Sequence, residues 1–356
     1  MKSFFFSLIF LGSFLGIQAQ QTKLLTAEKH NEYGLVYSLP LTGFKIDVVA
    51  VKKTEVAAPF FKYSKIFTSD SNVISENSTE WDIETVKITP FGAPDDQNRF
   101  LMQLKPGATT FIGVAEDGML LSINKEPLEI SEEEISVIAI EGNRTTGKEY
   151  LEFMNEDFIS AQSSYKQAQL LAEELTEIRE AKISLTRGTA ETMPTDGRQL
   201  EIMLENLDKQ EQALTNAFKG SSWKERTVKS FYIIPEEEGK SVVCRLSLSD
   251  GLVNADDYSG DPLYLSLKVV EEPTVPVDAK GEEKKLPKDA VMYCIPGLAE
   301  VSLSFGGKEL FQQVFPMSQF GFLFGLNPTL FTDKKEPSYA LFDPTTGALV
   351  ELGTQK

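Results

Sequence analysis

Residues 185–220 read "LTRGTAETMPTDGRQLEIMLENLDKQEQALTNAFKG", and this stretch decides the middle of the fold. Arg187-Gly188 closes one helical pattern, because glycine readily supplies the left-handed conformation in which many helices end. The loop "TAETMPTD" follows, and a second helix is predicted to start at Asp196 and to run to Lys219-Gly220. Two amphipathic helices joined by a short loop predict an antiparallel helical hairpin.

The first helix of this hairpin is expected to begin at Thr146. Apolar residues three and four positions apart continue from Leu151 to Leu185 and form one helical face. A continuous helix over residues 147–187 would be about 60 Å long, whereas the second helix would reach only about 35 Å. The uncovered part begins with aromatic residues. We therefore expect it to pack on a β domain, or the helix to break near Asn155.

The start of this helix also carries the letters of a phosphate-binding loop. Residues 142–148 spell G-x-x-x-x-G-K between an apolar run and a helical pattern. In a working loop the residue after the lysine gives a hydroxyl to Mg²⁺, but here it is Glu149. Thr146 and Glu149 instead fit the S/T-x-x-E capping box. We predict a helix start at this point and no nucleotide binding.

Strand-like sequence lies on both sides of the hairpin. Residues 34–141 mix β-branched and aromatic residues with turn signals, including Asp117-Gly118 in "TTFIGVAEDGMLLSIN". Residues 228–356 resume the same pattern, and "SYALFDPTTGALVEL" near the end loosely resembles that earlier hairpin. The sequence predicts an α+β, β-rich fold: two antiparallel β domains, each a sandwich or partial barrel, with the helical hairpin between them. Whether the two β domains are related stays open.

The predicted boundaries follow from these changes of pattern. We expect a signal peptide at residues 1–19, an N-terminal β domain at 20–145, the hairpin at 146–220 and a C-terminal β domain at 221–356. Residues 271–289 are highly charged and hold three prolines. That composition predicts a long, mobile loop between two strands.

The beginning of the chain predicts export. Lys2 precedes an apolar stretch from Phe4 to Leu15, and Ala19 is a small residue of the kind found at signal cleavage sites. The stretch is too short for the roughly 20 residues that span a bilayer. We expect cleavage before Gln20, no transmembrane span, and a location in the periplasm, in the outer envelope or outside the cell.

Charge limits the classes of partner. The chain has 53 acidic and 35 basic residues and a net charge of -18. Such a surface repels nucleic acid and anionic membranes, and no basic cluster interrupts it. We therefore expect neither nucleic acid nor an anionic membrane surface as a partner.

The two cysteines allow two interpretations. Cys244 and Cys294 both lie in strand-like runs, and an exported protein can form disulfides. They are either a disulfide between neighbouring strands or two buried free thiols. The only histidine is His30, so a Cys/His metal site lacks ligands. We predict no metal and no cofactor of that kind.

Loop carboxylates offer the remaining chemistry. A pair of acids held about 5–10 Å apart could hydrolyse a glycosidic bond, and several loop oxygens could bind Ca²⁺. Both loops that carry such acids also read as turns, and the second does not match a calcium-loop order. We therefore assign no catalytic residue. The acids in question are Asp95, Asp96, Asp250, Asp256, Asp257 and Asp261.

Aromatic residues are the other candidates for recognition. Trp81 and Trp223 are of the type that sugar-binding modules display. Phe320, Phe322 and Phe324 alternate with Gly321, Leu323 and Gly325, so both faces of this strand are apolar. Such a strand is expected to be buried between layers, with an exposed docking strand as the alternative.

Three stretches together resemble a known family. They are "YGLVYSLPLTGFKIDV" near the expected mature start, the helix-loop-helix quoted above, and the region from "YCIPGLAEV" to "QFGFLFGL". They resemble the domain of unknown function 4831 family of exported Bacteroidota proteins over nearly the whole mature chain. The resemblance implies a place in a Gram-negative cell envelope. It brings no activity, cofactor or site residue.

Taken together, these patterns predict an exported, non-catalytic binding or scaffolding module whose partner is another envelope protein or a glycan. The alternative is a carboxylate-dependent glycan hydrolase of the envelope. Residues 188–197 at the hairpin tip and the loop 271–289 are the expected contact sites, because loops carry recognition more often than the elements they join.

Overall fold

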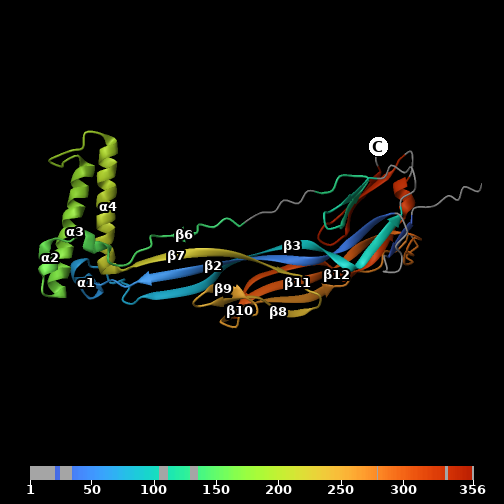
Figure 1. The fold of residues 1–356 in the computed structure, drawn as a ribbon, viewed down its shortest axis with the longest axis horizontal. Helices are drawn as coiled ribbons and strands as arrows, with labels where there is room; N and C mark the ends of the chain where they lie inside the picture. Colours follow the sequence, from blue (N-terminus) through green and yellow to red (C-terminus); the bar gives the residue numbers. More distant parts are fainter. Residues whose placement is uncertain are drawn as a thin grey trace, which may run out of the picture.

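The protein is elongated, with helices at one end and β-sheets along the rest of its length (Figure 1). The computed structural model describes residues 21–24, 34–103, 111–128, 135–278, 280–332 and 336–354, and residues 21–24 by their backbone alone. The signal peptide predicted at residues 1–19 and His30 therefore lie outside the described residues.

Three antiparallel sheets form the β part. The first has the order β1 (Gln21–Leu24), β3 (Ser78–Gln103), β2 (Leu35–Val56), β7 (Ser221–Ile233) and β6 (Ile140–Glu141). The second has the order β12 (Lys308–Leu326), β11 (Val291–Phe305), β10 (Gly260–Glu271), β8 (Gly239–Ser247) and β9 (Gly251–Asn254). The third has the order β14 (Leu349–Thr354), β13 (Ser338–Phe342), β5 (Leu120–Ile123) and β4 (Ile112–Val114).

The first and second sheets pack face to face as a sandwich. Phe44, Ile46 and Val48 lie two residues apart on β2, so their side chains leave the same face of the strand. They are fully buried against residues of β10 and β11 such as Leu265 and Val301. This sandwich confirms the predicted β-rich α+β class.

Strands from both sides of the hairpin share two of these sheets. β7 follows the hairpin in sequence but pairs with β2, and β13 near the end of the chain pairs with β5. A second buried core, which includes Tyr37, Ile123, Val291 and Phe342, lies where the third sheet meets β2 and β11. The sheets thus cross the boundary drawn between residues 20–145 and 221–356, and the limits of independent domains stay a prediction.

Two hairpins of the β part carry the same irregularity. Between β2 and β3, Leu39 alone lies opposite four residues, 95–98. Between β11 and β12, Pro296 alone lies opposite four residues, 318–321. A bulge bends its strand and raises the local twist. Both hairpins are therefore bent at the same point, four or five residues from the start of their first strand.

The turns that follow these two hairpins also make matching contacts. The Ser38 N–H donates to the Gly118 carbonyl oxygen, and the Cys294 N–H donates to that of Gly347, each at 3.0 Å. Each contact is an isolated parallel bridge beside a short hairpin, β4–β5 in one case and β13–β14 in the other. The segments β2–β5 and β11–β14 therefore have the same arrangement, and the loose likeness of the two turn sequences belongs to an internal repeat.

The helical head is the group of helices at one end of the molecule, and none of its described helices is long and apolar enough to cross a membrane. The predicted helix over 147–187 is broken at Asn155, whose side-chain oxygen accepts a hydrogen bond from the Phe158 N–H at 3.0 Å. The head consists of η1 (Phe61–Tyr63), α1 (Ser64–Phe67), η2 (Glu149–Phe153), α2 (Glu156–Ser160), α3 (Ser164–Arg187) and α4 (Gly197–Lys219), and a further short helix, η3 (Pro328–Thr332), lies in the β part.

The hairpin itself, α3 and α4, has the caps that its sequence predicts. α3 ends at Gly188 in the left-handed conformation (φ 70°), and Asp196 accepts from the Gln199 N–H at 2.7 Å to begin α4. The expected capping box is half formed, because the Glu149 carboxylate accepts from the Thr146 N–H at 2.5 Å. The Thr146 hydroxyl accepts from the Lys148 N–H instead of that of Glu149.

Aromatic side chains bind the base of the hairpin to the loop between β2 and β3. The ring of Phe60 lies 5.7 Å from Tyr150 and 6.2 Å from both Phe158 and Phe218. The Phe60 N–H also donates to the Ala217 carbonyl oxygen at 2.9 Å. The aromatic base therefore packs inside the head, around a loop that the first β segment contributes.

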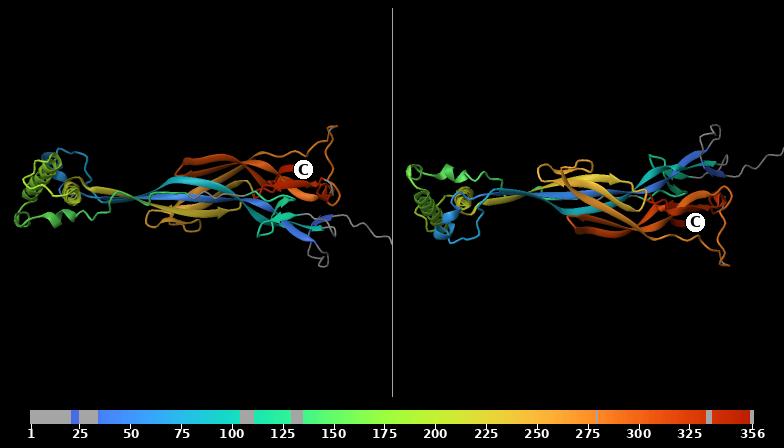
Figure 2. Two further views of the ribbon diagram at one scale, coloured as in Figure 1. Left: turned by 90° about the horizontal axis from the view of Figure 1, so that it is seen from above. Right: turned by 90° about the horizontal axis from the view of Figure 1, so that it is seen from below.

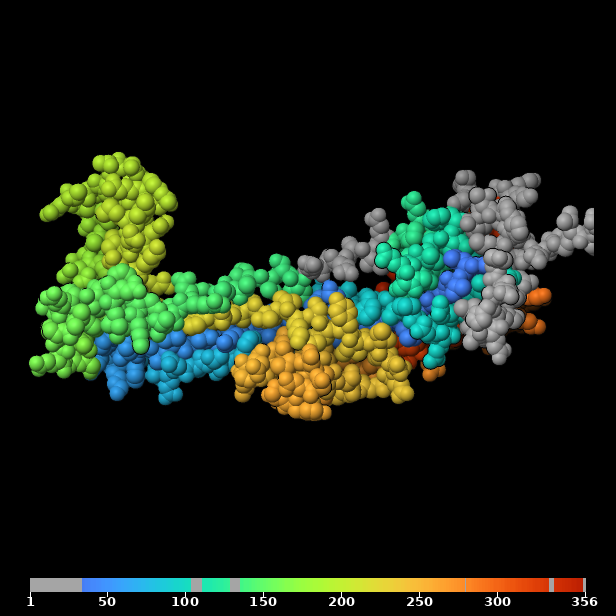
Figure 3. All heavy atoms as spheres, viewed as in Figure 1, coloured from blue at the N-terminus to red at the C-terminus, as the bar shows by residue number. Residues whose placement is uncertain are grey.

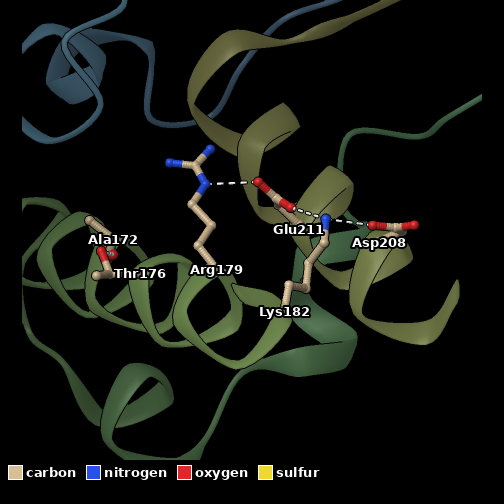
Figure 4. Close-up of polar contacts among 6 residues, drawn as sticks. All are labelled: Ala172, Thr176, Arg179, Lys182, Asp208 and Glu211. Atoms are coloured by element: carbon tan, nitrogen blue, oxygen red, sulfur yellow. Dashed lines mark hydrogen bonds and ion pairs between the residues drawn. The ribbon is translucent and has the colours of Figure 1, made fainter. Parts of the chain in front are cut away.

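Ion pairs join the two helices farther up the hairpin (Figure 4). Arg179 and Lys182 of α3 reach Glu211 of α4, and Lys182 also reaches Asp208, at 2.5–2.8 Å. Lys182 lies on the face that α3 turns toward α4, where an unpaired charge would be costly. The two carboxylates explain how a lysine fits into an otherwise apolar face. In the same view, the Thr176 hydroxyl donates to the carbonyl oxygen of Ala172, one turn earlier in α3.

A ribbon one sheet thick connects the head to the β body, which we define as the rest of the three sheets (Figures 1 and 2). Residues 53–56, 78–80 and 221–224 of β2, β3 and β7 form this ribbon. Its side chains are half-buried or exposed. The short strand β6 pairs with the free edge of β7 beside it. Arg226 holds β6 in place by pairing with Glu84 at 2.5 Å and with Glu141 at 2.7 Å.

Replacing Arg226 with alanine is expected to speed amide exchange several-fold at residues 138–142, because β6 has two residues in its ladder and depends on side-chain contacts. Hydrogen exchange followed by mass spectrometry measures this. Arg198→Ala removes an exposed ion pair within α4 and should leave residues 138–142 unchanged. Equal exchange in both variants would contradict a role for Arg226 in holding β6.

Acid should speed amide exchange at residues 138–142 as Arg226→Ala does. Arg226 lowers the pKa of Glu84 and of Glu141 through the hydrogen bonds that it donates to them. The stabilisation is therefore complete above the unfolded pKa of about 4.3 and is lost as pH falls through the lowered folded values. We expect exchange at residues 138–142, corrected for the intrinsic pH dependence, to rise below about pH 4 in the native chain and not in Arg226→Ala.

Candidate functional site: a pocket between two bulges

The two bulges face each other across a pocket of about 270 Å³. The β3 bulge contributes Asp95 and Asn98, and the β12 bulge contributes Ser318, Gln319 and Gly321. The rest of the wall comes from the neighbouring strands and is mainly apolar: Leu39, Pro40, Leu41, Cys294, Phe322 and Leu323. Both halves of the internal repeat thus build the pocket.

A hydrogen-bond network holds the β12 bulge against β2. The Thr42 N–H lies 3.1 Å from both the Ser318 hydroxyl oxygen and the Gln319 side-chain oxygen. In return the Ser318 N–H donates to the Thr42 hydroxyl oxygen at 3.1 Å. The Gln319 amide nitrogen donates to the carbonyl oxygens of Thr42 (2.9 Å) and Pro235 (2.7 Å). The buried Thr42 and the half-buried Ser318 and Gln319 are thus hydrogen-bonded, so they position the wall of the pocket.

Asp95 and Asp96 line different pockets. Asp95 is 9% exposed and accepts from the Gln97 N–H at 2.8 Å and from the Asn98 side-chain nitrogen at 2.6 Å. Asp96 lines a smaller pocket of about 160 Å³, together with Arg99 and Asp117. The structure therefore does not bring these two loop acids together on one ligand.

The acids of the second predicted loop lie at the far end of β10. Asp250 accepts from the Ser249 hydroxyl at 2.5 Å, and Asp257 accepts from the Ser259 N–H at 3.0 Å, so both stabilise their own turns. Asp261 is ten residues from Glu271, which corresponds to about 33 Å of strand. Within the described ranges, no group of three or more acids, cysteines or histidines could hold a metal ion.

Both cysteines are free and buried, which overturns the alternative of a Cys244–Cys294 disulfide. Cys244 lies opposite Leu263 of β10, and the next residue of β10 lies opposite Ser304 of β11. Cys294 is ten residues from Ser304, or about 33 Å along the strand, whereas a disulfide needs Cα atoms within about 7 Å. Burial raises the pKa of both thiols to about 12, which removes their nucleophilic form at neutral pH.

The aromatic candidates are placed differently from one another. The indole N–H groups of Trp81 and Trp223 are buried and have no hydrogen-bond partner among the described residues, and both side chains are half-buried. β12 is the outermost strand of its sheet in the part of the chain that the structure describes. Its Phe-rich part is half-buried, because Phe320 and Phe324 pack against the two buried cores of the β part. Phe320 and Phe322 are half-buried at the sheet edge and line pockets.

A sequence repeat that marks this site is visible once the bulges are known. Residues 37–40 are Tyr-Ser-Leu-Pro and residues 293–296 are Tyr-Cys-Ile-Pro, at the start of β2 and β11. Proline lacks an N–H and therefore suits a bulge, where the ladder is interrupted. Each copy of the motif is four residues long, and the two copies are 256 positions apart. The likeness of the two turn sequences alone therefore does not reveal it.

Tyr37 ties the two halves together beside the pocket. Its hydroxyl accepts from the Met292 N–H at 2.9 Å and donates toward the Met292 carbonyl oxygen at 3.3 Å. Burial raises its pKa above the ordinary value, so the hydroxyl stays protonated and able to donate.

Tyr37→Phe is expected to cost about 1–3 kcal/mol of unfolding free energy, because it leaves both backbone groups of Met292 without their partner. Urea unfolding followed by circular dichroism measures the loss. Tyr293→Phe is the matched control, since Tyr293 holds the equivalent place in the repeat and no hydrogen bond of its hydroxyl is described. A loss of similar size in both variants would show that the Tyr37 hydrogen bonds are unimportant.

Comparison with known proteins adds a family and nothing about chemistry. No curated protein and no solved structure matches the chain significantly. One family model matches residues 33–350, which covers both halves of the internal repeat and the helical head. The family carries no assigned activity, so no residue role can be transferred to the pocket. By this match over most of its length, the chain belongs to the family described as domain of unknown function (DUF4831).

Proposed function

We propose that this chain is exported to the cell envelope and acts there as a non-catalytic scaffold that binds another envelope protein or a glycan. The observation that carries the proposal is the separation of the helical head from the β body by a ribbon one sheet thick. β2 has 22 residues and β3 has 26, which corresponds to about 70–85 Å of strand. These strands run through both the β body and the ribbon, and a molecule of this length suits contact with partners at its two ends.

The two predicted contact segments lie at opposite ends of the molecule. Residues 188–197 form the exposed tip of the hairpin, which stands clear of the ribbon and the β body in Figure 3. Residues 271–289 lie at the other end (Figure 2), where Val277 and Glu283 form an isolated bridge and the described side chains are half-buried or exposed. Exposed loops of this kind are common recognition sites, which supports contacts at both ends.

The placement of the loop acids that the sequence singles out supports scaffolding over the hydrolase alternative. A glycosidase needs two carboxyl groups facing one bond. Here Asp95 and Asp96 line separate pockets, and Asp250, Asp257 and Asp261 lie at the far end of β10. The nearby Cys294 thiol is held protonated by burial.

The compartment rests on sequence and on the family. The charged start at Lys2, the short apolar stretch from Phe4 to Leu15 and the small Ala19 support cleavage and export. Resemblance to exported Bacteroidota proteins supports the periplasm or the outer envelope of such a cell. Mass spectrometry of the chain from its native host would identify its first residue, and a chain retained in the cytosol with residues 1–19 attached would disprove export.

Site-specific photo-crosslinking in the native envelope tests the scaffold. A benzoylphenylalanine at Met193, which is 40% exposed at the hairpin tip, is expected to capture one discrete envelope protein. The same group at Leu248, 79% exposed on the β body, is the control and should not capture it. Deletion of residues 189–195 should abolish co-purification of the captured protein. Retained co-purification would rule out the tip as the contact.

A further inference from the structure

A second pocket adjoins the one between the bulges. It measures about 370 Å³ and is lined by Glu272, Pro273 and Phe320. The two pockets share Gln319, Gly321 and Phe322, so they lie on either side of the β12 bulge. A molecule that filled both would cross the outer edge of β12.

The two pockets share part of their wall. Each also has one carboxylate, from Asp95 or Glu272, and the half-buried ring of Phe322 lines both, with Phe320 added in the second. Neither lining includes a lysine or an arginine. The protein surface as a whole is acidic, with a net charge of -18. Anionic ligands are disfavoured here, and hydrogen-bond donors with an apolar face are favoured.

We propose that the two pockets bind consecutive units of a neutral oligosaccharide, which deepens the binding function proposed above. A pyranose ring carries hydroxyl donors at its edge and C–H groups on its face. The donors match the carboxylates, and the C–H face matches the rings of Phe320 and Phe322. Because each pocket adds its own carboxylate to the shared wall of Gln319, Gly321 and Phe322, the pair suits a ligand that repeats the same unit.

The site is built before any ligand arrives. Both Asp95 oxygens already accept one hydrogen bond each, which fixes the carboxylate and leaves about two of its four lone-pair positions for a ligand. The Gln319 side chain is fixed by bonds to Thr42 and Pro235. At Gly321 a Cβ would lie 2.2 Å from the Ile295 carbonyl oxygen, so the bulge is held close to β11. Preorganised walls lower the entropy cost of binding.

Titration calorimetry on the purified chain from residue 20 onward tests the proposal. The probes are four neutral trisaccharides (maltotriose, cellotriose, mannotriose and triacetylchitotriose), one anionic trisaccharide (trigalacturonate) and trilysine. At least one neutral trisaccharide is expected to bind. Phe322→Leu, which keeps the apolar volume, and Glu272→Gln should each weaken that binding about tenfold. Tyr258→Ala, at an aromatic residue 84% exposed on another loop, is the control and should leave it unchanged.

Three results would overturn the proposal: no neutral trisaccharide binds at millimolar concentration, trilysine binds in their place, or binding survives both pocket variants. The last result would mean that the sugar binds elsewhere on the chain. Circular dichroism of each variant confirms that it is folded before its titration is interpreted. Because the crosslink from Met193 is measured separately, failure of the sugar site and failure of the scaffold are distinguishable.

Discussion

Phe44→Ala is expected to lower the unfolding free energy of the β body by about 3–5 kcal/mol, because a fully buried ring between two sheets leaves a cavity that the sandwich cannot close. Phe44 is 0% exposed, and its ring meets Phe315 of β12 edge-on at 5.3 Å. The pair joins the first sheet to the second and hence one half of the repeat to the other. Urea unfolding followed by tryptophan fluorescence measures the loss.

Tyr232→Ala is the matched control for this prediction. Tyr232 is an aromatic residue of the same sheet, opposite Lys45, the residue next to Phe44 in the chain. It is 66% exposed and contacts Phe91 on the surface, so its removal should cost less than about 1 kcal/mol. Equal losses in both variants would mean that the face-to-face sandwich is not the main source of stability.

Phe218→Ala should remove a similar amount, about 3–5 kcal/mol, from the helical head alone. Phe218 is 1% exposed, and its ring lies 6.2 Å from Phe60 and 6.4 Å from Phe67. This core is separate from the two cores of the β body. Hydrogen exchange is therefore expected to rise throughout α3 and α4, while β10 and β11 keep their protection.

The control for the head lies in the same helix. Ile202 is 44% exposed on α4, and Ile202→Ala should change exchange of the hairpin little. Loss of protection in β10 and β11 together with the helices of Phe218→Ala would show that the head and the β body unfold as one unit. It would also remove the basis for treating the ribbon as a spacer between two separately stable parts.

Local features of the fold were predictable from the sequence. Gly188 and Asp196 mark the ends of the hairpin helices, and Asn155 marks the break in the first one, because caps depend on residues within one helical turn. The β-rich class was predictable as well. Strand propensity and turns such as Asp117-Gly118 act over short distances.

Strand partners were not predictable in the same way. β7 pairs with β2 across the whole helical head, and β13 pairs with β5 from the other end of the chain. Such pairings are decided by the packing of complete sheets, which no short window of sequence contains. The position of Phe322 on an edge strand was not predictable for the same reason, since strand order depends on the complete sheet. The pocket escaped prediction because it arises only where the two bulges meet.

Contacts such as that of Tyr37 with Met292 join residues 255 positions apart. The first half of the repeat therefore cannot finish folding until the last strands of the chain have arrived. A chain crossing a membrane from its first residue onward would remain incompletely folded for most of its passage, with unpaired strands that are prone to aggregation. We expect strand β5 to stay without this neighbour until β13, more than 200 residues later, has paired with it.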